Sequence, residues 1–181
     1  FPAGILPEDR YPENGRIKPA QQQVKLQATW MGSIRALRAG GRLLVLDGLH
    51  PGGRPRQLAP DKPGSFWRPD LSFDAQKVLF CFKPHNEKSF HLYEINVDGT
   101  GLVQLTDGPY DDIEPAYLPD GDIIFPSSRC RRFVACWYTP VATLHRLDPE
   151  TGEIRSLSSN IVHENTPAVL PDGRVLYTRW E

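Results

Sequence analysis

One phrase of twelve residues occurs twice in this chain of 181 residues. Residues 114–125 read EPAYLPDGDIIF and residues 166–177 read TPAVLPDGRVLY, which places the second copy 52 residues after the first. A weaker copy, residues 68–80, begins 46 residues before the first. Internal periods of this size indicate one supersecondary unit repeated along the chain. We therefore predict a repeat protein.

Each copy of the phrase predicts a β-hairpin. In its x-Pro-Asp-Gly-x turn, proline presets φ near −65° and glycine accepts a positive φ, and a β-branched or aromatic run follows. A second hairpin is expected over residues 92–105 and again over 144–157. Two hairpins in about 46 to 52 residues make four strands, which is the size of a propeller blade. Residues 43–58 fit the second half of an earlier blade.

The predicted fold class is all-β: a β-propeller of four-stranded antiparallel blades, present as an incomplete arc of about two and a half blades. The 18 prolines and 15 glycines favour many short strands joined by turns. We expect residues 1–40 to be a linker or the edge of a preceding domain, and 41–181 to be a partial propeller with blade boundaries near 60, 108 and 160. The arc is expected to belong to a longer protein whose further blades cover its exposed edges.

The repeat resembles that of the TolB-type, or PD40 and WD40-like, six-bladed β-propellers, in residues 92–108 and in Glu114-Pro115 with 118–121. This match covers residues 41–181. Three further segments look most like the propeller, or middle, domain of hydrazine-synthase alpha-subunit-like proteins: residues 110–115, 127–130 and 170–181. The resemblance implies a periplasmic or otherwise exported bacterial protein of several domains. Its expected partners are other domains of the parent chain or a partner protein.

Charge and hydropathy exclude two classes of partner. A net charge of −1 and a pI near 6.6 argue against a protein held on nucleic acid by bulk electrostatics. No run approaches the roughly 18 apolar residues that a membrane-spanning helix requires. We expect neither nucleic-acid binding nor a membrane span.

Sequence signatures of catalysis are missing from this segment, so no catalytic residue is assigned. It contains no Gly-x-Ser-x-Gly elbow, no phosphate-binding Gly-x-x-x-x-Gly-Lys loop and no Cys-x-x-Cys-His haem-attachment motif. The favoured hypothesis is a non-catalytic interaction or scaffold segment without a cofactor. The alternative is the propeller domain of a haem-dependent, hydrazine-synthase-like redox enzyme, with haem c held elsewhere in the parent protein. A third hypothesis is carbohydrate or peptide binding through Trp67, Trp137 and Trp180.

The second unit has an insertion in its central connection, which is seven residues longer from Phe125 to Leu144 than from Phe80 to Leu92. Insertions on repeat scaffolds often lie on the binding face. One interpretation makes its arginines ligands for an anion or a partner chain, with two aromatic anchors; the candidate residues are Arg129, Arg131, Arg132, Trp137 and Tyr138. The favoured interpretation is structural: solvated arginines in a loop closed by a disulfide between Cys130 and Cys136.

Acidic residues crowd the loop that enters the second unit. Carboxylates at this density suit Ca²⁺, and the candidate ligands are Asp111, Asp112 and Glu114. The spacing matches no EF-hand, and the next unit has His163-Glu164-Asn165 in the same place. We therefore favour a structural role, in which these side chains accept backbone N–H groups from loops or a neighbouring blade. The single remaining cysteine, Cys81, is expected to pack as a small buried hydrophobe.

Overall fold

The structure, a computed structural model, describes residues 41–47, 52–58, 62–85, 87–135 and 138–180. The predicted linker of residues 1–40 lies outside this part of the chain. The described residues form short strands, all paired antiparallel. Their bounds are β1 Leu44–Leu46, β2 Pro55–Gln57, β3 Gly64–Leu71, β4 Lys77–Pro84, β5 His91–Asn96, β6 Val103–Gln104, β7 Ala116–Tyr117, β8 Ile123–Ser127, β9 Thr143–Leu147, β10 Ile154–Ser156, β11 Glu164–Val169 and β12 Val175–Arg179.

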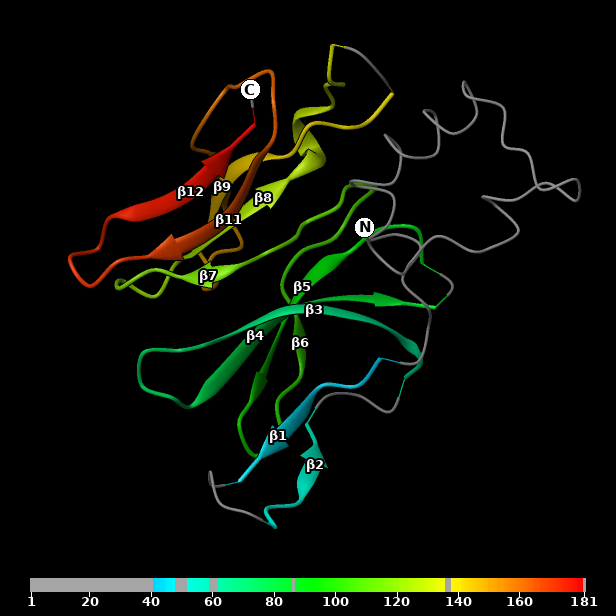
Figure 1. Cartoon of the computed structure of the whole chain (residues 1–181), viewed down its shortest axis with the longest axis vertical. Coiled ribbons are helices and arrows are strands. Elements are labelled where there is room, and N and C mark those ends of the chain that lie inside the picture. Colours follow the sequence, from blue (N-terminus) through cyan, green and yellow to red (C-terminus); the bar gives the residue numbers. More distant parts are fainter. Residues whose placement is uncertain (1–40, 48–51, 59–61, 86, 136–137, 181) are drawn as a thin grey trace, which may run out of the picture.

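The strands make four sheets that follow one another along the chain. Two are complete four-stranded meanders, in the orders β3-β4-β5-β6 and β7-β8-β9-β10, and two are hairpins, β1-β2 and β11-β12. Figure 1 shows the two hairpins at opposite ends of the described structure. The prediction of an all-β arc of four-stranded blades is confirmed, and β11-β12 adds a second half blade to it.

The repeated turns adopt the backbone that their residues favour. Gly121 has a φ of 94° and Gly173 a φ of 83°, so both occupy the left-handed region that glycine tolerates. The weaker first copy has Ala75 at this point, with a φ of 57°. The predicted hairpins are therefore confirmed at the two Pro-Asp-Gly turns.

The second hairpins of the units also match one another. The N–H groups of Leu58, Leu105 and Leu157 donate to Leu43, Leu92 and Leu144 respectively, each over 2.8 Å. The β1-β2 hairpin is thus built like β5-β6 and β9-β10, and residues 43–58 are the second half of a blade, as the sequence indicates.

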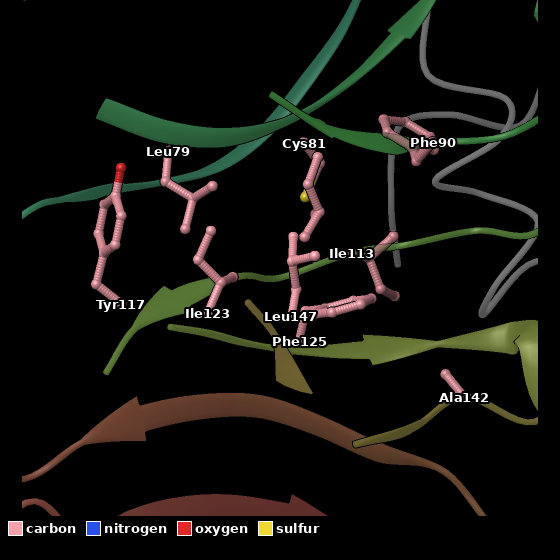
Figure 2. Close-up of a cluster of buried hydrophobic side chains, with 10 residues drawn as sticks. Leu79, Cys81, Phe90, Ile113, Tyr117, Ile123, Phe125, Ala142 and Leu147 are labelled. Atoms are coloured by element: carbon pink, nitrogen blue, oxygen red, sulfur yellow. The ribbon is translucent and has the colours of Figure 1, made fainter. Parts of the chain in front are cut away.

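An apolar core fills the space between the two complete sheets. Figure 2 shows Leu79 and Cys81 of β4 pointing toward Ile123 and Phe125 of β8. All four side chains are fully buried. Burial raises the pKa of the Cys81 thiol well above its ordinary value, so this cysteine behaves as an apolar packing residue.

Each half blade has a core of its own against the adjacent complete sheet. Phe80 and Phe82 of β4 pack toward Leu58 and the β1-β2 hairpin. Ile124 of β8 belongs to a separate cluster, against which Val169 and Val175 of β11-β12 pack. Every sheet is therefore apolar on the faces that meet a neighbouring sheet, which is the packing of successive propeller blades.

Helical structure in the described residues is limited to a 3₁₀ turn, Ser128–Cys130. In that part of the chain, no helix has the length and apolar character needed to cross a bilayer.

Candidate functional site

The connection between β8 and β9, residues 128–142, is the largest departure from the repeat. In the ladders, Phe80 pairs with Tyr93 whereas Phe125 pairs with His145, so the second sheet carries seven more residues in this connection. The insertion predicted from the sequence is confirmed. It begins in the 3₁₀ turn, where the Ser127 side chain accepts from the Arg129 N–H.

Arg129 fixes the start of this connection to the sheet. Its guanidinium donates to the Asp112 carboxylate over 2.8 Å and to the Ser127 hydroxyl over 3.0 Å. It also lies 5.1 Å from the ring centroid of Tyr110. The Asp112 side chain is 0% exposed and that of Arg129 is 20% exposed. A charge pair this deeply buried is a structural anchor, because each ion needs the other to offset its lost hydration.

The other two candidate arginines also have partners within the chain. Arg131 donates to the Tyr110 hydroxyl over 2.7 Å and stacks on its ring at 5.4 Å. Arg132 donates to the Ser159 carbonyl oxygen over 2.8 Å, which ties the connection to the loop before β11. Each of the three arginines thus has a partner within the chain, while Arg131 and Arg132 remain exposed to solvent. Their binding of an anion or a partner chain stays a prediction.

The outer part of the connection exposes two aromatic rings. Phe133 is 57% exposed and Tyr138 is 81% exposed. Their ring centroids are 6.3 Å apart in an edge-on arrangement, and Phe133 forms a β-bridge with Pro140. Phe133 was not among the residues predicted for binding, although its place inside the insertion was a usable signal. Of the predicted anchors, Trp137 lies outside the described residues.

The disulfide remains a prediction. The thiol of Cys130 donates to the Val141 carbonyl oxygen over 3.2 Å. Cys136 lies outside the described residues, so the pairing of these two cysteines has no geometric test here.

The acidic loop that enters the second blade uses its carboxylates as acceptors. Asp111 accepts the Phe90 N–H over 3.1 Å, and Asp112 accepts from Ser127 and Arg129. Glu114 accepts the N–H of Thr166 in the next sheet. The structural role expected for this loop is confirmed by these bonds. Among the described residues, no group of three or more histidine, cysteine or acidic side chains is arranged to hold a metal ion.

The equivalent loop of the next unit also accepts backbone N–H groups, but with partly different side chains. His163, at the position of Asp111, accepts the Ala142 N–H at Nδ1 over 3.2 Å. Its side chain is 1% exposed and stacks on Trp180 at 5.5 Å. Burial lowers the pKa of His163 to about 4, because the charged imidazolium would lose its hydration. Glu164, fully buried, accepts the Leu144 N–H over 2.8 Å.

A second repeated feature is a backbone kink at the residue before the proline in each copy of the phrase. Arg68, Glu114 and Thr166 each have a φ of 49°, an uncommon conformation for residues other than glycine. The ladder register shifts at this point in β3 and β11. The repeated x-Pro pair was visible in the sequence, but the bulge was not predicted.

The first strands of three successive sheets line a cavity of about 400 Å³. Its walls are residues 68–71, 73, 115–117 and 167–169. Asp70 accepts the Tyr117 N–H over 2.9 Å across the cavity wall. The Tyr117 hydroxyl donates to Glu94 over 2.9 Å, and burial beside this carboxylate raises the pKa of Tyr117. The polar groups here hold neighbouring sheets together.

No protein-family model matches this chain, and no curated protein does. Solved structures do share its fold. TolB from Agrobacterium tumefaciens gives a TM-score of 0.58 at 22% identity, over 72% of this chain and 43% of its own. Hydrazine synthase from Kuenenia stuttgartiensis gives 0.56 at 19% identity, over 68% of this chain and 22% of its own. A puromycin hydrolase gives a TM-score of 0.54 at 22% identity, over 69% of this chain and 20% of its own.

The sheet order and these likenesses define the class: the chain is an arc of a β-propeller built from four-stranded antiparallel blades. More specifically, its fold resembles that of the TolB propeller. The chain spans less than half the length of each of the three structures.

Proposed function

We propose that this chain is a non-catalytic propeller segment of a larger exported bacterial protein, and that it binds a protein surface through the β8-β9 connection. The observation that carries the proposal is the exposed aromatic pair Phe133 and Tyr138 on an anchored insertion. The partner is another domain of the same polypeptide or a separate protein.

Two physical arguments support this use of the connection. Aromatic side chains bury a large area at a low cost in side-chain entropy, and they dominate interface energetics. The buried pair of Arg129 with Asp112 and the bond from Arg132 to Ser159 hold the connection before any partner arrives. A preordered loop loses less conformational freedom on binding, which raises affinity for the same contact area.

The redox alternative has less support. The likeness to hydrazine synthase at 19% identity concerns the fold alone. The chain contains no Cys-x-x-Cys-His motif, so this alternative requires that haem c be attached elsewhere in a parent protein.

A photo-crosslinking amino acid in place of Tyr138 tests the proposal in the exported protein fraction of the host. We expect one dominant adduct whose yield falls at least tenfold when Phe133→Ser is added. The matched control is Phe73→Ser, since Phe73 is 70% exposed in the turn after β3. An adduct that persists with Phe133→Ser, or no adduct at all, would overturn the proposal.

A further inference from the structure

The β8-β9 connection carries two positive charges that its own hydrogen bonds do not neutralise. Arg131 donates to the Tyr110 hydroxyl, and Arg132 donates to the carbonyl oxygens of Ser159 and Asn160. All of these acceptors are neutral. In the part of the chain that the structure describes, neither arginine forms an ion pair with a carboxylate, so both charges remain on this surface.

Arg129 shows how the same side chain is used when its charge is satisfied. Its Nε donates to Ser127 and its Nη2 to Asp112, so the guanidinium edge that can bind a carboxylate through two parallel bonds is occupied. Arg132 bonds to described residues through Nη1 alone. Its Nε and Nη2 edge is therefore left for an acceptor outside the chain.

The backbone and a neighbouring ring hold the two exposed arginines in place. Arg131 closes the 3₁₀ turn with a φ of 53°, and its guanidinium lies 5.4 Å from the centroid of the Tyr110 ring. The Arg132 carbonyl accepts the N–H of Val141 over 2.8 Å. A guanidinium that is already positioned loses less side-chain freedom when it binds.

The charged residues adjoin the exposed aromatic pair of the same connection. Phe133 follows Arg132 directly, and the Tyr138 ring lies edge-on to the Phe133 ring. Arginine and aromatic side chains are the residues most enriched in the parts of interfaces that dominate binding energy. The connection thus offers cations and apolar rings within one short segment.

The charge of the connection differs in sign from that of the whole chain. The chain has a net charge of −1, whereas residues 128–142 contain three arginines and no acidic residue. The carboxylates that precede the connection in its own sheet, Asp111 and Asp112, are 2% and 0% exposed, and Asp112 is paired with Arg129. Negative charge on a partner is therefore attracted to this loop and not to the chain at large.

We propose that the partner of this surface is an acidic protein segment. Its carboxylates bind Arg131 and Arg132, and its apolar side chains pack on Phe133 and Tyr138. This inference rests on the proposed function and adds the chemistry of the partner to it. The surface belongs to the complete sheet β7-β10, which has a neighbouring sheet on each side.

Fluorescence anisotropy of labelled copolymers, titrated with the full chain, tests this preference. The probes are a random copolymer of glutamate and tyrosine, which combines carboxylates with rings, and a copolymer of lysine and tyrosine. We expect the glutamate copolymer to bind about tenfold more tightly or better at low salt, despite the net charge of −1 on the chain. Its affinity should fall as salt is added, because salt screens exposed charges.

Arg131→Gln combined with Arg132→Gln should abolish the preference for glutamate. Arg131→Lys combined with Arg132→Lys keeps both charges and should retain the preference at a lower affinity, which separates loss of charge from rearrangement of the loop. The matched control is Arg42→Gln with Arg54→Gln, because both of these arginines are exposed at the β1-β2 hairpin and the same charge is removed.

Equal binding of the two copolymers, or a preference that survives the glutamine variant, would overturn the proposal. Tighter binding of a single-stranded oligothymidylate than of the glutamate copolymer would also overturn it, and would assign the arginines to phosphate groups. The crosslink at Tyr138 detects a protein partner of any charge. An adduct that forms and persists with Arg131→Glu leaves the proposed function standing and excludes an acidic partner, whereas the absence of any adduct contradicts the proposed function itself.

Discussion

The φ angles of single residues decide whether the repeated turn can form. Gly121 has a φ of 94°, and a side chain built there would meet no atom within 4 Å. A substitution at this position therefore changes the backbone preference and little else. At Gly173, which has a φ of 83°, a Cβ atom would lie 3.9 Å from the Pro119 side chain, an ordinary contact, so the backbone preference again dominates.

Gly121→Val and Gly173→Val should each lower the free energy of unfolding by about 1 kcal/mol or more, because β-branched residues resist positive φ. Denaturant unfolding monitored by circular dichroism measures the change. Gly121→Asn is the control, since asparagine enters the left-handed region more readily and should cost less. Unchanged midpoints in both valine variants would contradict the described turns.

His163 makes stability depend on pH at the scale of one side chain. Its pKa of about 4 lies below the 6.5 of an unperturbed histidine, so the unfolded chain binds the proton more tightly than the folded chain. The contribution of neutral, buried His163 to the free energy of unfolding is complete above pH 6.5 and is lost as the pH falls toward 4. About 3 kcal/mol should be lost over this window.

Unfolding free energies of the unmodified protein and of His163→Asn at pH 7 and pH 4 isolate this effect. Asparagine keeps an acceptor for the Ala142 N–H, just as Asp111 accepts the Phe90 N–H one unit earlier. We expect the variant to lose less stability on acidification, by about 3 kcal/mol. Equal pH slopes in the two proteins would show that His163 is not buried in its neutral form.

At the scale of elements, the β8-β9 connection depends on a buried charge pair with its own sheet. Arg129→Gln would leave the Asp112 carboxylate, which is 0% exposed, with the Ser127 hydroxyl as a hydrogen-bond donor and His91 Nδ1 at 3.7 Å. Removing one partner of a buried pair costs about 3 kcal/mol or more. Thermal and denaturant unfolding should show this loss.

Arg132→Gln serves as the comparison for that prediction. Its hydrogen bond to the Ser159 carbonyl is exposed, so less than about 1 kcal/mol should be lost. If both variants lose the same stability, the connection is not anchored as described.

The strands and their order could be predicted because local signals define them. A Pro-Asp-Gly turn followed by a β-branched run predicts a hairpin from a few adjacent residues. The anchoring of the β8-β9 connection could not be predicted, because its contacts join residues far apart in the sequence. Arg129 bonds to Asp112, 17 positions earlier, and Arg132 bonds to Ser159, 27 positions later. Sequence reasoning found these arginines but not their partners.

The acidic loop was interpreted more successfully. Its counterpart in the next unit is polar but not consistently acidic, which argued for hydrogen bonding over metal binding. The bond from the Thr166 N–H to Glu114 agrees with this reasoning. The kinks at Arg68 and Glu114 were missed, because an x-Pro pair ordinarily indicates extended backbone rather than a positive φ.

At the scale of the whole molecule, each sheet is stabilised mainly by the sheets beside it. Separate apolar clusters lie between β1-β2 and the first complete sheet, between the two complete sheets, and between the second and β11-β12. Repeat architectures of this kind gain stability from each unit and each interface between units. The two complete sheets should therefore be equally protected, while the ends depend on what covers their edges.

Amide hydrogen exchange, resolved along the chain, tests the arrangement of sheets most directly. We predict that β4, β5, β8 and β9 exchange slowest, and to similar extents, because each is paired on both sides within a complete sheet. Slow exchange confined to one of the two sheets, or found in segments outside these four strands, would contradict the propeller arc.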